Sequence, residues 1–270
     1  MTGVHPILNS ILAHKREELR FGKAMVSEEE LLFAAERKGQ KPRSLYSVLT
    51  APGGKVRIIA EIKRSSPSAM IKPTGFDPAR IAQAYETAGA CAISVLTDAR
   101  FFCGAPVYVP MAREAVSLPV LRKDFILDRW QLAETAALGA DAVLLMVANF
   151  QDVSAFESLY HRALELNLEP LVEIHSEKEW ERISHLKPRL VGVNNRDFMS
   201  PTLAVDSGTA LRIAPLLPDD VAVVSESGIS SPEQIRRAME AGVDGFLIGS
   251  HFMKQENPGK ALHELISQAG

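Results

Sequence analysis

The stretch IAEIKRSSPS at residues 59–68 decides the fold class, because an apolar run passes directly into charged and hydroxyl side chains. The same form recurs in PVLRKDF at 119–125, LVEIH at 171–175, VGVNNRD at 191–197, VVSESG at 223–228 and FLIGS at 246–250. Runs this apolar are typical of parallel strands that are buried on both faces. In a (β/α)8 TIM barrel the carboxyl ends of such strands converge on one site. The pattern therefore predicts an α/β enzyme with this fold.

The composition fits one enzyme domain and excludes nucleic acid as a partner. The chain has 270 residues, of which 46% are hydrophobic and 23% charged, and this length suits a single barrel. We expect residues 1–270 to form one domain, with residues 1–50 as an N-terminal helical extension. The 30 basic and 33 acidic residues give a formal charge of −3, so that no cationic surplus is available to neutralise a phosphate backbone.

The cysteine content and the hydropathy pattern predict a cytoplasmic protein. Cys91 and Cys103 are too few for a disulfide framework, and the segment between them lacks the paired spacing of a zinc site. We expect both thiols to be reduced. The longest apolar stretch, residues 142–148, is far shorter than the roughly 20 residues that span a bilayer. Because the N-terminus also lacks a signal sequence, no membrane partner is expected.

Helix and strand signals divide the chain into an extension and repeating units. Apolar residues at helical spacing between positions 7 and 12 predict an amphipathic first helix, and Ser27 with Glu30 predicts a capping box that begins a second. From Val56 onward, strand and helix signals alternate as in consecutive βα units. Eight strands are expected near residues 56–62, 91–96, 118–122, 141–147, 169–174, 189–194, 221–225 and 244–248.

Capping residues between these strands support the same division. Asp77 before Pro78 predicts an N-cap with proline at the first helical position, and Asn257 before Pro258 opens a last helix. Two further pairs predict reciprocal capping boxes, Ser176 with Glu179 and Ser231 with Gln234. Three glycines are expected to end helices in the left-handed conformation, namely Gly89, Gly139 and Gly242. A doubly wound open sheet is the alternative, but the chain has neither GxGxxG nor GxxxxGK[ST].

Charged residues at the predicted strand ends are the candidate catalytic groups. Glu61 and Lys63 lie two residues apart and so point to the same face, where we expect them to pair with each other or with a substrate. Four later strands end on Lys123, Glu173, Asn194 and Glu226. Two lysines and three glutamates in one cavity would shift one another's pKa values and favour acid–base catalysis without a metal. The alternative is a charged network that only holds loops, but burying this many charges is costly unless they are used.

Two hydroxyl and glycine pairs predict a phosphorylated substrate. Ser227-Gly228 follows the seventh predicted strand and Gly249-Ser250 follows the eighth, where barrels frequently bind phosphate. A single pair of this kind would be an ordinary turn. Because both stand at the expected strand ends, we interpret them as a phosphate site.

The aromatic and histidine residues near strand ends are less specific. Phe101 and Phe102 either belong to the core or cover a flat substrate ring. His175 and His251 are interpreted as polar surface residues, because neither has a second metal ligand or a paired serine.

The strand-end motifs also occur in the order of a known family. IAEIKRSSPS, SVLTD followed by FF and Gly104, LPVLRKDF, LVEIH, GVNNRD, VVSESGI and FLIGS together resemble the indole-3-glycerol phosphate synthase family. The ILxxILAHKREEL stretch near the N-terminus is similar to that family's extra helical segment. The resemblance covers almost the whole chain and implies an enzyme of tryptophan biosynthesis.

The resemblance implies a substrate and a reaction. A carbon–carbon lyase of this family closes, decarboxylates and dehydrates 1-(2-carboxyphenylamino)-1-deoxyribulose 5-phosphate to indole-3-glycerol phosphate, and no cofactor is implied. The implied partner is therefore a phosphorylated small molecule. We expect a monomer or a weak homo-oligomer, and association with other tryptophan-pathway enzymes stays open.

The resemblance also implies residue roles. Lys123 resembles the general acid that polarises the ketone during ring closure, and Glu173 resembles the carboxylate that handles protons in rearomatisation and dehydration. The partition of these roles with Lys63 stays open. Three residues would orient the substrate and the ammonium groups, namely Glu61, Asn194 and Glu226. The implied substrate and phosphate contacts are Ser66, Phe102, Arg196, Ser227, Gly228, Gly249 and Ser250.

Two departures from the family pattern and two alternatives remain. Ala69-Met70 stands where many members carry Lys-Gly, and residues 198–204 form a longer stretch than usual. Both departures lie on predicted loops, so that they affect the expected loop closure and turnover rate more than the reaction type.

A phosphoribosylanthranilate isomerase would need a Cys and Asp pair at strand ends, and neither cysteine ends a predicted strand. A non-catalytic barrel that senses a phosphorylated metabolite would be favoured by loss of a Lys or Glu of the set, and none is lost.

Overall fold

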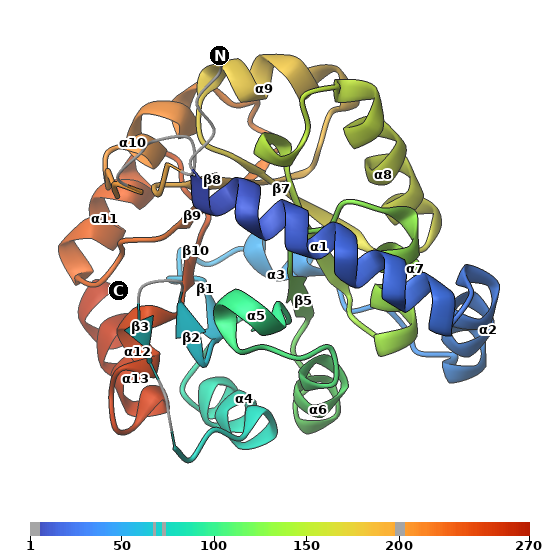
Figure 1. Ribbon diagram of the computed structural model, residues 1–270. Coiled ribbons are helices and arrows are strands. Elements are labelled where there is room, and N and C mark those ends of the chain that lie inside the picture. Colours follow the sequence, from blue (N-terminus) through green and yellow to red (C-terminus); the bar gives the residue numbers. More distant parts are fainter. Residues whose placement is uncertain (1–5, 67–68, 72–73, 198–202) are drawn as a thin grey trace.

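The computed structural model describes residues 6–66, 69–71, 74–197 and 203–270. Within these residues, eight parallel strands close into a barrel in the order β1-β10-β9-β8-β7-β6-β5-β4 (Figure 1). The strands are β1 (Ile58–Ile62), β4 (Ala92–Leu96), β5 (Val120–Lys123), β6 (Ala142–Met146), β7 (Glu169–Ile174), β8 (Leu190–Asn194), β9 (Ala222–Glu226) and β10 (Gly245–Ile248). Each begins and ends within two residues of its predicted range, and the predicted (β/α)8 barrel is confirmed.

Helices surround the barrel and follow the strands along the chain. The long ones are α4 (Pro78–Thr87), α6 (Tyr108–Ala115), α7 (Arg129–Leu138), α8 (Val153–Glu165), α9 (Glu177–Ile183), α11 (Pro232–Glu240) and α13 (Pro258–Ala269). Shorter ones are α5 (Ala99–Phe102), α10 (Thr209–Ile213), α12 (Ser250–Met253), η1 (Val147–Asn149), η2 (Ser184–Leu186) and η3 (Ala214–Leu216). After β1, a small antiparallel pair is formed by β2 (Ser65–Ser66) and β3 (Ala69–Met70), so that the Ala69-Met70 departure lies in this hairpin.

The N-terminal extension consists of α1 (Pro6–Met25), α2 (Glu28–Lys38) and α3 (Leu45–Leu49). Figure 1 shows α1, in blue, crossing the face of the barrel, and α2 beside α7. The apolar side chains of Leu8 and Ile11 in α1 are buried against one end of the barrel interior. Those of Leu45 and Leu49 in α3 are buried against the other end. The amphipathic first helix is therefore as predicted, and the extension covers both ends of the barrel.

Most predicted helix caps are present. Ser27 and Glu30 form a reciprocal capping box, as do Ser231 and Gln234. Asp77 caps α4 with Pro78 following, Asn257 caps α13, and the three predicted glycines have positive φ of 99°, 85° and 92° at Gly89, Gly139 and Gly242.

The box predicted for Ser176 and Glu179 is wrong in one half. The Ser176 hydroxyl accepts from the N–H of Glu179, but the Glu179 carboxylate accepts from the N–H of His175 at 2.6 Å. The last residue of β7 paired with β6 is Glu173, so that the His175 N–H lies beyond that ladder. The carboxylate satisfies this donor instead of the N-cap N–H.

Alternation along the strands separates two apolar layers. On β1, Ile58, Ala60 and Ile62 face the surrounding helices, whereas Ile59 faces the barrel interior. The interior layer is apolar from the amino ends of the strands to their middle, with Leu121, Leu171 and Leu247 among its members. Two residues after these inward apolar side chains, the next inward positions carry polar side chains on most strands, as in Glu61 after Ile59 and Lys123 after Leu121. These polar side chains therefore meet at the carboxyl ends of the strands.

Two further features bear on the class of protein. Cys91 and Cys103 are free thiols, and burial raises the pKa of Cys91 to about 12. Among the described residues, no helix combines the length and the apolar character that a membrane crossing requires.

Candidate active site

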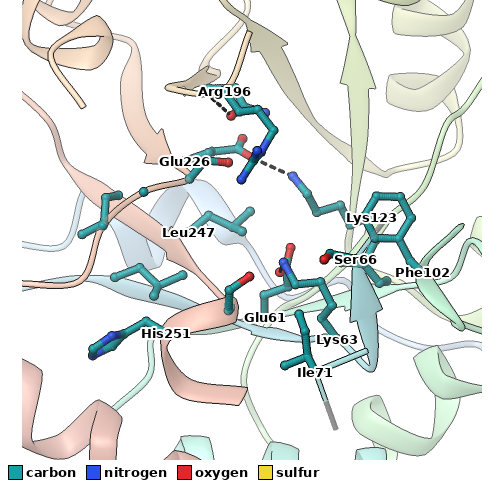
Figure 2. Close-up of a pocket in the computed structure, with 18 of the residues that line it drawn as sticks. Glu61, Lys63, Ser66, Ile71, Phe102, Lys123, Arg196, Glu226, Leu247 and His251 are labelled. Carbon is teal, nitrogen blue, oxygen red and sulfur yellow. Dashed lines mark hydrogen bonds and ion pairs between the residues drawn. The ribbon is translucent and has the colours of Figure 1, made fainter. Parts of the chain in front are cut away.

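A cavity of about 500 Å³ opens at the carboxyl ends of the strands (Figure 2). Every residue that the sequence predicted for the site lies on its wall: Glu61, Lys63, Ser66, Phe102, Lys123, Glu173, Asn194, Arg196, Glu226, Ser227, Gly228, Gly249 and Ser250. These residues come from seven of the eight βα units and span almost 190 positions of sequence, from 61 to 250. The barrel brings them together because its strands are parallel and end at one face.

Lys123 lies at the centre of the charged set. It is the last residue of β5 and points inward, whereas its neighbour Arg122 points outward and is bonded to the Thr135 hydroxyl of α7 at 3.0 Å. The Lys123 ammonium is 2.6 Å from Oε2 of Glu226 and 3.4 Å from Oε2 of Glu173. Burial acts to lower the pKa of Lys123, but these carboxylates outweigh it and raise the pKa above its usual value. The ammonium therefore stays charged and can donate a proton to a bound oxygen.

Glu226 is buried at the end of β9 and has only one carboxylate oxygen paired. Oε2 accepts from Lys123, whereas Oε1 has no hydrogen-bond partner among the described residues. Desolvation raises the pKa of Glu226 to about 7, against the opposing effect of the Lys123 charge. Gly192 of β8 leaves space for this carboxylate, because a Cβ at that position would overlap Oε1. Glu226 can therefore exchange a proton near neutral pH.

Lys63 and Glu61 form a second pair on the opposite wall of the cavity. The Lys63 ammonium is 2.6 Å from Oε2 of Glu61, as the two-residue spacing predicted. Gly249, at the end of β10, borders the same carboxylate, and a Cβ there would overlap it. Since β1 pairs with β10, this contact lies at the seam where the barrel closes. Figure 2 shows the pair facing Lys123 and Glu226 across the cavity.

Arg196 supplies a third cation. Its backbone N–H donates to the Asn194 side-chain oxygen at 2.9 Å, and its guanidinium donates to the Leu203 carbonyl at 3.1 Å. Burial lowers the pKa of Arg196, while the Glu61 charge acts in the opposite direction. The side chain extends into the cavity beside Glu226 (Figure 2). Residues 198–202 of the departure predicted after Asp197 lie outside the described residues.

Two turns at the end of β9 and β10 form the remaining wall. Ser227 and Gly228 have positive φ of 66° and 75°, which turns the backbone of this segment sharply after β9. Asn195 fixes the first turn, because its side-chain amide donates to the Ser227 carbonyl at 2.9 Å. Gly249 and Ser250 begin the short helix α12. All four residues of these turns line the cavity.

The aromatic pair divides between two environments. Phe102 lines the cavity, and its ring lies 6.1 Å from that of Phe125. Phe101 faces the other way and packs edge-on against His14 of α1, with ring centroids 6.1 Å apart. Of the two alternatives for these residues, contact with a ligand is therefore open to Phe102 alone.

The two histidines also separate. His175 lies outside the large cavity, and its Nδ1 is 2.7 Å from the Asn194 carbonyl. His251 is half-buried and is among the residues that line the cavity. Its signal in the sequence was its position directly after Ser250, on the first turn of α12.

Sequence reasoning also missed the apolar wall and two charged residues, Asp124 and Lys254. The wall includes Ile7, Ile71, Leu96, Phe125, Leu144, Met146 and Leu247. Inward parity could have found Leu144 and Met146, which alternate with outward residues on β6. Asp124 lines the cavity edge next to Lys123 and was not singled out. In the part of the chain that the structure describes, no cluster of three or more His, Cys, Asp or Glu side chains could hold a metal ion.

Comparison with known proteins decides the family. The family model for indole-3-glycerol phosphate synthase matches residues 8–265. The chain belongs to the indole-3-glycerol phosphate synthase family. The resemblance and the place in tryptophan biosynthesis that the sequence predicted are therefore confirmed.

Relatives in this family match over nearly their full length. Indole-3-glycerol phosphate synthase from Acidithiobacillus ferrooxidans is 43% identical over 262 residues, covering 96% of this chain and 98% of that protein. The family members from Geobacillus kaustophilus and Bordetella pertussis are each 41% identical, over 263 and 266 residues, which are 97% and 98% of this chain and 97% and 100% of those proteins.

Solved structures of low identity share the fold. Orotidine 5'-phosphate decarboxylase from Pyrococcus horikoshii OT3 superposes with a TM-score of 0.60 at 12% identity, over 78% of this chain and 98% of that one. Thiamine phosphate pyrophosphorylase from Pyrococcus furiosus gives a TM-score of 0.57 at 19% identity, over 84% and 98%. These likenesses support the barrel and nothing further.

Proposed function

We propose that this protein converts 1-(2-carboxyphenylamino)-1-deoxyribulose 5-phosphate into indole-3-glycerol phosphate, carbon dioxide and water, as a carbon–carbon lyase. The observation that carries the proposal is the convergence of Lys63, Lys123 and Glu173 in one cavity at the carboxyl ends of the strands. Family membership supplies the reaction, and this convergence supplies groups able to perform it.

The charges of the cavity suit a ligand that has two anionic groups, a phosphate and a carboxylate. The wall carries four cations, Lys63, Lys123, Arg196 and Lys254, and four carboxylates, Glu61, Asp124, Glu173 and Glu226. Because the pKa of Glu226 is about 7, this carboxylate is partly protonated near neutral pH, which leaves an excess of positive charge.

Each group of the substrate has a matching part of the wall. We assign the phosphate to the turns at Ser227-Gly228 and Gly249-Ser250, where backbone N–H groups can bind it. The aryl ring is assigned to Phe102 and the apolar wall, and its carboxylate to Arg196. Ser66 and Asn194 then orient the sugar hydroxyls.

The first chemical step needs an acid. We assign it to Lys123, which protonates the ketone oxygen while the aryl carbon that bears the carboxylate attacks the carbonyl carbon. The carbon–carbon bond to the carboxylate then breaks, carbon dioxide leaves, and its electron pair restores the aromatic ring. A charged ammonium fixed by two carboxylates is suited to this donation, because it stays protonated up to the moment of transfer.

The second step removes water. The new hydroxyl leaves with a proton supplied by an ammonium, and a proton of the ring intermediate passes to a base to form the indole double bond. We assign the base to Glu173, and Lys63 stands on the opposite wall as a second acid. Glu61 and Glu226 hold the two ammonium groups in place through the 2.6 Å contacts described above.

The test is a direct assay for indole absorbance and fluorescence with the purified protein. Glu173→Gln keeps the side-chain shape but removes the base, and should lower kcat by about 10² to 10⁴-fold. Glu179→Gln is the matched control, because Glu179 is a half-buried carboxylate near Glu173 that lies outside the 500 Å³ cavity and accepts from a backbone N–H. It should keep wild-type kcat.

Absence of any indole signal from folded wild-type protein would refute the proposed function. Equal rates for Glu173→Gln and wild type would refute the role of Glu173 alone. We further propose that the protein acts in the cytoplasm as a single domain, in monomeric or weakly associated form, which sedimentation velocity would check.

A further inference from the structure

The N-terminal extension holds a buried cation that the sequence did not single out. Lys15 of α1 is 4% exposed, and its ammonium lies 3.0 Å from Oδ1 of Asp124, 3.1 Å from Oδ2 of Asp98 and 2.5 Å from Oε2 of Glu18. Glu18 belongs to α1 itself, whereas the two aspartates belong to the barrel. A single side chain of the extension therefore joins the ends of β4 and β5.

Asp98 connects Lys15 to α5, the helix that carries the cavity residue Phe102. It follows β4 and caps α5, because its Oδ1 accepts from the backbone N–H of Phe101 at 2.8 Å. Helix α5 is a single turn that carries Phe102 at its end. The direction of the Phe102 ring thus depends on where the Asp98 carboxylate is held.

Asp124 connects Lys15 to Lys123, the proposed general acid. It is the next residue after Lys123, and its side chain accepts from the Phe125 N–H at 2.8 Å and from the Thr97 hydroxyl at 2.6 Å. The Thr97 N–H in turn donates to the Lys123 carbonyl at 3.1 Å. The backbone that follows Lys123 is therefore fixed, directly and through Thr97, by one carboxylate, and Lys15 contacts this carboxylate.

Stability alone is a weak explanation for this arrangement. A buried ion pair costs so much desolvation that it often adds little to the free energy of folding. The apolar side chains of α1, Leu8 and Ile11, already attach the helix to the barrel. What Lys15 adds is a fixed distance between two segments that each carry a cavity-lining residue.

We propose that Lys15 is a positioning residue, which holds Phe102 and Lys123 in their working orientation through Asp98 and Asp124. This inference rests on the proposed function, since both held residues are assigned to that reaction. The extension is on this view part of the active site, although the Lys15 ammonium itself does not line the cavity.

The test compares two lysines of the same helix. Lys15→Met keeps the aliphatic stem and removes the ammonium. Lys23→Met is the matched control, because Lys23 also joins α1 to the barrel, with its ammonium 2.6 Å from Asp128, but it is 46% exposed and Asp128 is outside the cavity wall. Steady-state kinetics are measured for both well below their unfolding temperatures.

Lys15→Met should lower kcat through Lys123 and raise KM through Phe102, with a combined loss in kcat/KM of about 10²-fold, the effect typical of a misplacement near 1 Å. Lys23→Met should stay within about twofold of wild type. An unchanged kcat/KM in Lys15→Met, or an equal loss in Lys23→Met, would overturn the proposal.

A double variant covers the case in which Lys15→Met folds poorly. Lys15→Met combined with Asp98→Asn removes the most deeply buried of the three negative charges that lose the ammonium, and Asp124 keeps Arg122 as a partner. An asparagine at position 98 can still cap α5. It should regain thermal stability without regaining kcat/KM. If activity returns together with stability, Lys15 has a structural role only. Wild type is assayed in parallel, so that failure of the proposed function, seen as no indole from wild type, is distinguishable from failure of this inference.

Discussion

The two ends of the barrel both bury carboxylates, but they satisfy them differently. At the amino ends, Asp141 accepts from the N–H groups of Arg43 and Val120 and pairs with Arg113, whose Nε lies 3.0 Å away. Glu169 likewise accepts from the Ser44 hydroxyl and from two backbone N–H groups of α3. At the carboxyl ends, Glu61, Glu173 and Glu226 have lysine ammonium groups as the partners described above.

The difference separates stability from chemistry. A carboxylate that accepts from several backbone N–H groups cannot change partners without disrupting the fold. The carboxylates at the amino end therefore stabilise the structure. An ammonium on a flexible stem can leave its carboxylate for a ligand, because no backbone bond is lost. Substitutions at the carboxyl end should therefore lower kcat with little change in stability. Substitutions at the amino end should lower the free energy of unfolding with little change in kcat.

The largest effect is expected for Lys123→Ala at the carboxyl end. Loss of the proposed acid should lower kcat by about 10² to 10⁴-fold. The free energy of unfolding should change little, because the two carboxylates that lose their partner border an open cavity and Glu226 can take up a proton. Turnover assays and urea denaturation of the same preparation check both halves. A loss of several kcal/mol in the free energy of unfolding of Lys123→Ala would contradict the proposed difference between the two ends of the barrel.

The opposite result is expected for Glu169→Ala at the amino end. The substitution removes an acceptor from three donors, and should lower the free energy of unfolding by about 2 to 4 kcal/mol, since bonds to charged groups contribute about 1.5 to 3 kcal/mol each and solvent recovers part of the loss. The kcat should be that of wild type. Glu165→Ala is the control: Glu165 is exposed and its partner Arg162 keeps Glu28, so that the substitution should cost under about 0.5 kcal/mol.

A third prediction concerns the pH dependence of stability. The pKa of Glu226 in the folded protein is about 7, above its ordinary value of 4.5, so that the folded state binds more protons between these values. The stability from this group is present below about pH 4.5 and is lost as the pH rises through about 7. Glu226→Gln should remove this part of the decline, about 1 to 3 kcal/mol. Urea denaturation at several pH values measures it, and parallel profiles for both proteins would contradict the prediction.

The smallest effect is expected at Arg189, on the segment that enters β8. Its guanidinium lies 3.8 Å from the ring centroid of Tyr46 in α3. Arg189→Gln should lower the free energy of unfolding by about 0.5 to 1 kcal/mol, as expected for an exposed cation–π contact, and leave kcat unchanged. A larger loss would mean that α3 depends on this contact more than on the bonds to Glu169.

The strands and the charged site could be predicted because both follow from short-range patterns. An apolar run that closes on Lys123 or Glu226 gives the strand, its end and the inward direction of its last residue at once. Parallel pairing then brings such ends together without knowledge of any contact. Ser27 with Glu30 and Asp77 with Pro78 were equally local signals.

Contacts between distant segments could not be predicted in this way. Lys15 reaches Asp98 and Asp124 across 83 and 109 positions of sequence, and nothing near Lys15 distinguishes it from other charged residues of an exposed helix face. The bond from Glu179 to the His175 N–H depends on where the β6–β7 ladder stops. His251 lines the cavity from the short helix α12, whose path after Gly249 does not follow from the sequence pattern.

The seam between β1 and β10 also sets when the protein becomes active during its synthesis. Glu61 emerges from the ribosome long before Gly249, the glycine that leaves room for its carboxylate. Until then the first strand has no neighbour on that side, and the Lys63–Glu61 pair has no wall to lie against. A nascent chain can thus hold every lysine and glutamate of the site and still be unable to turn over a single molecule.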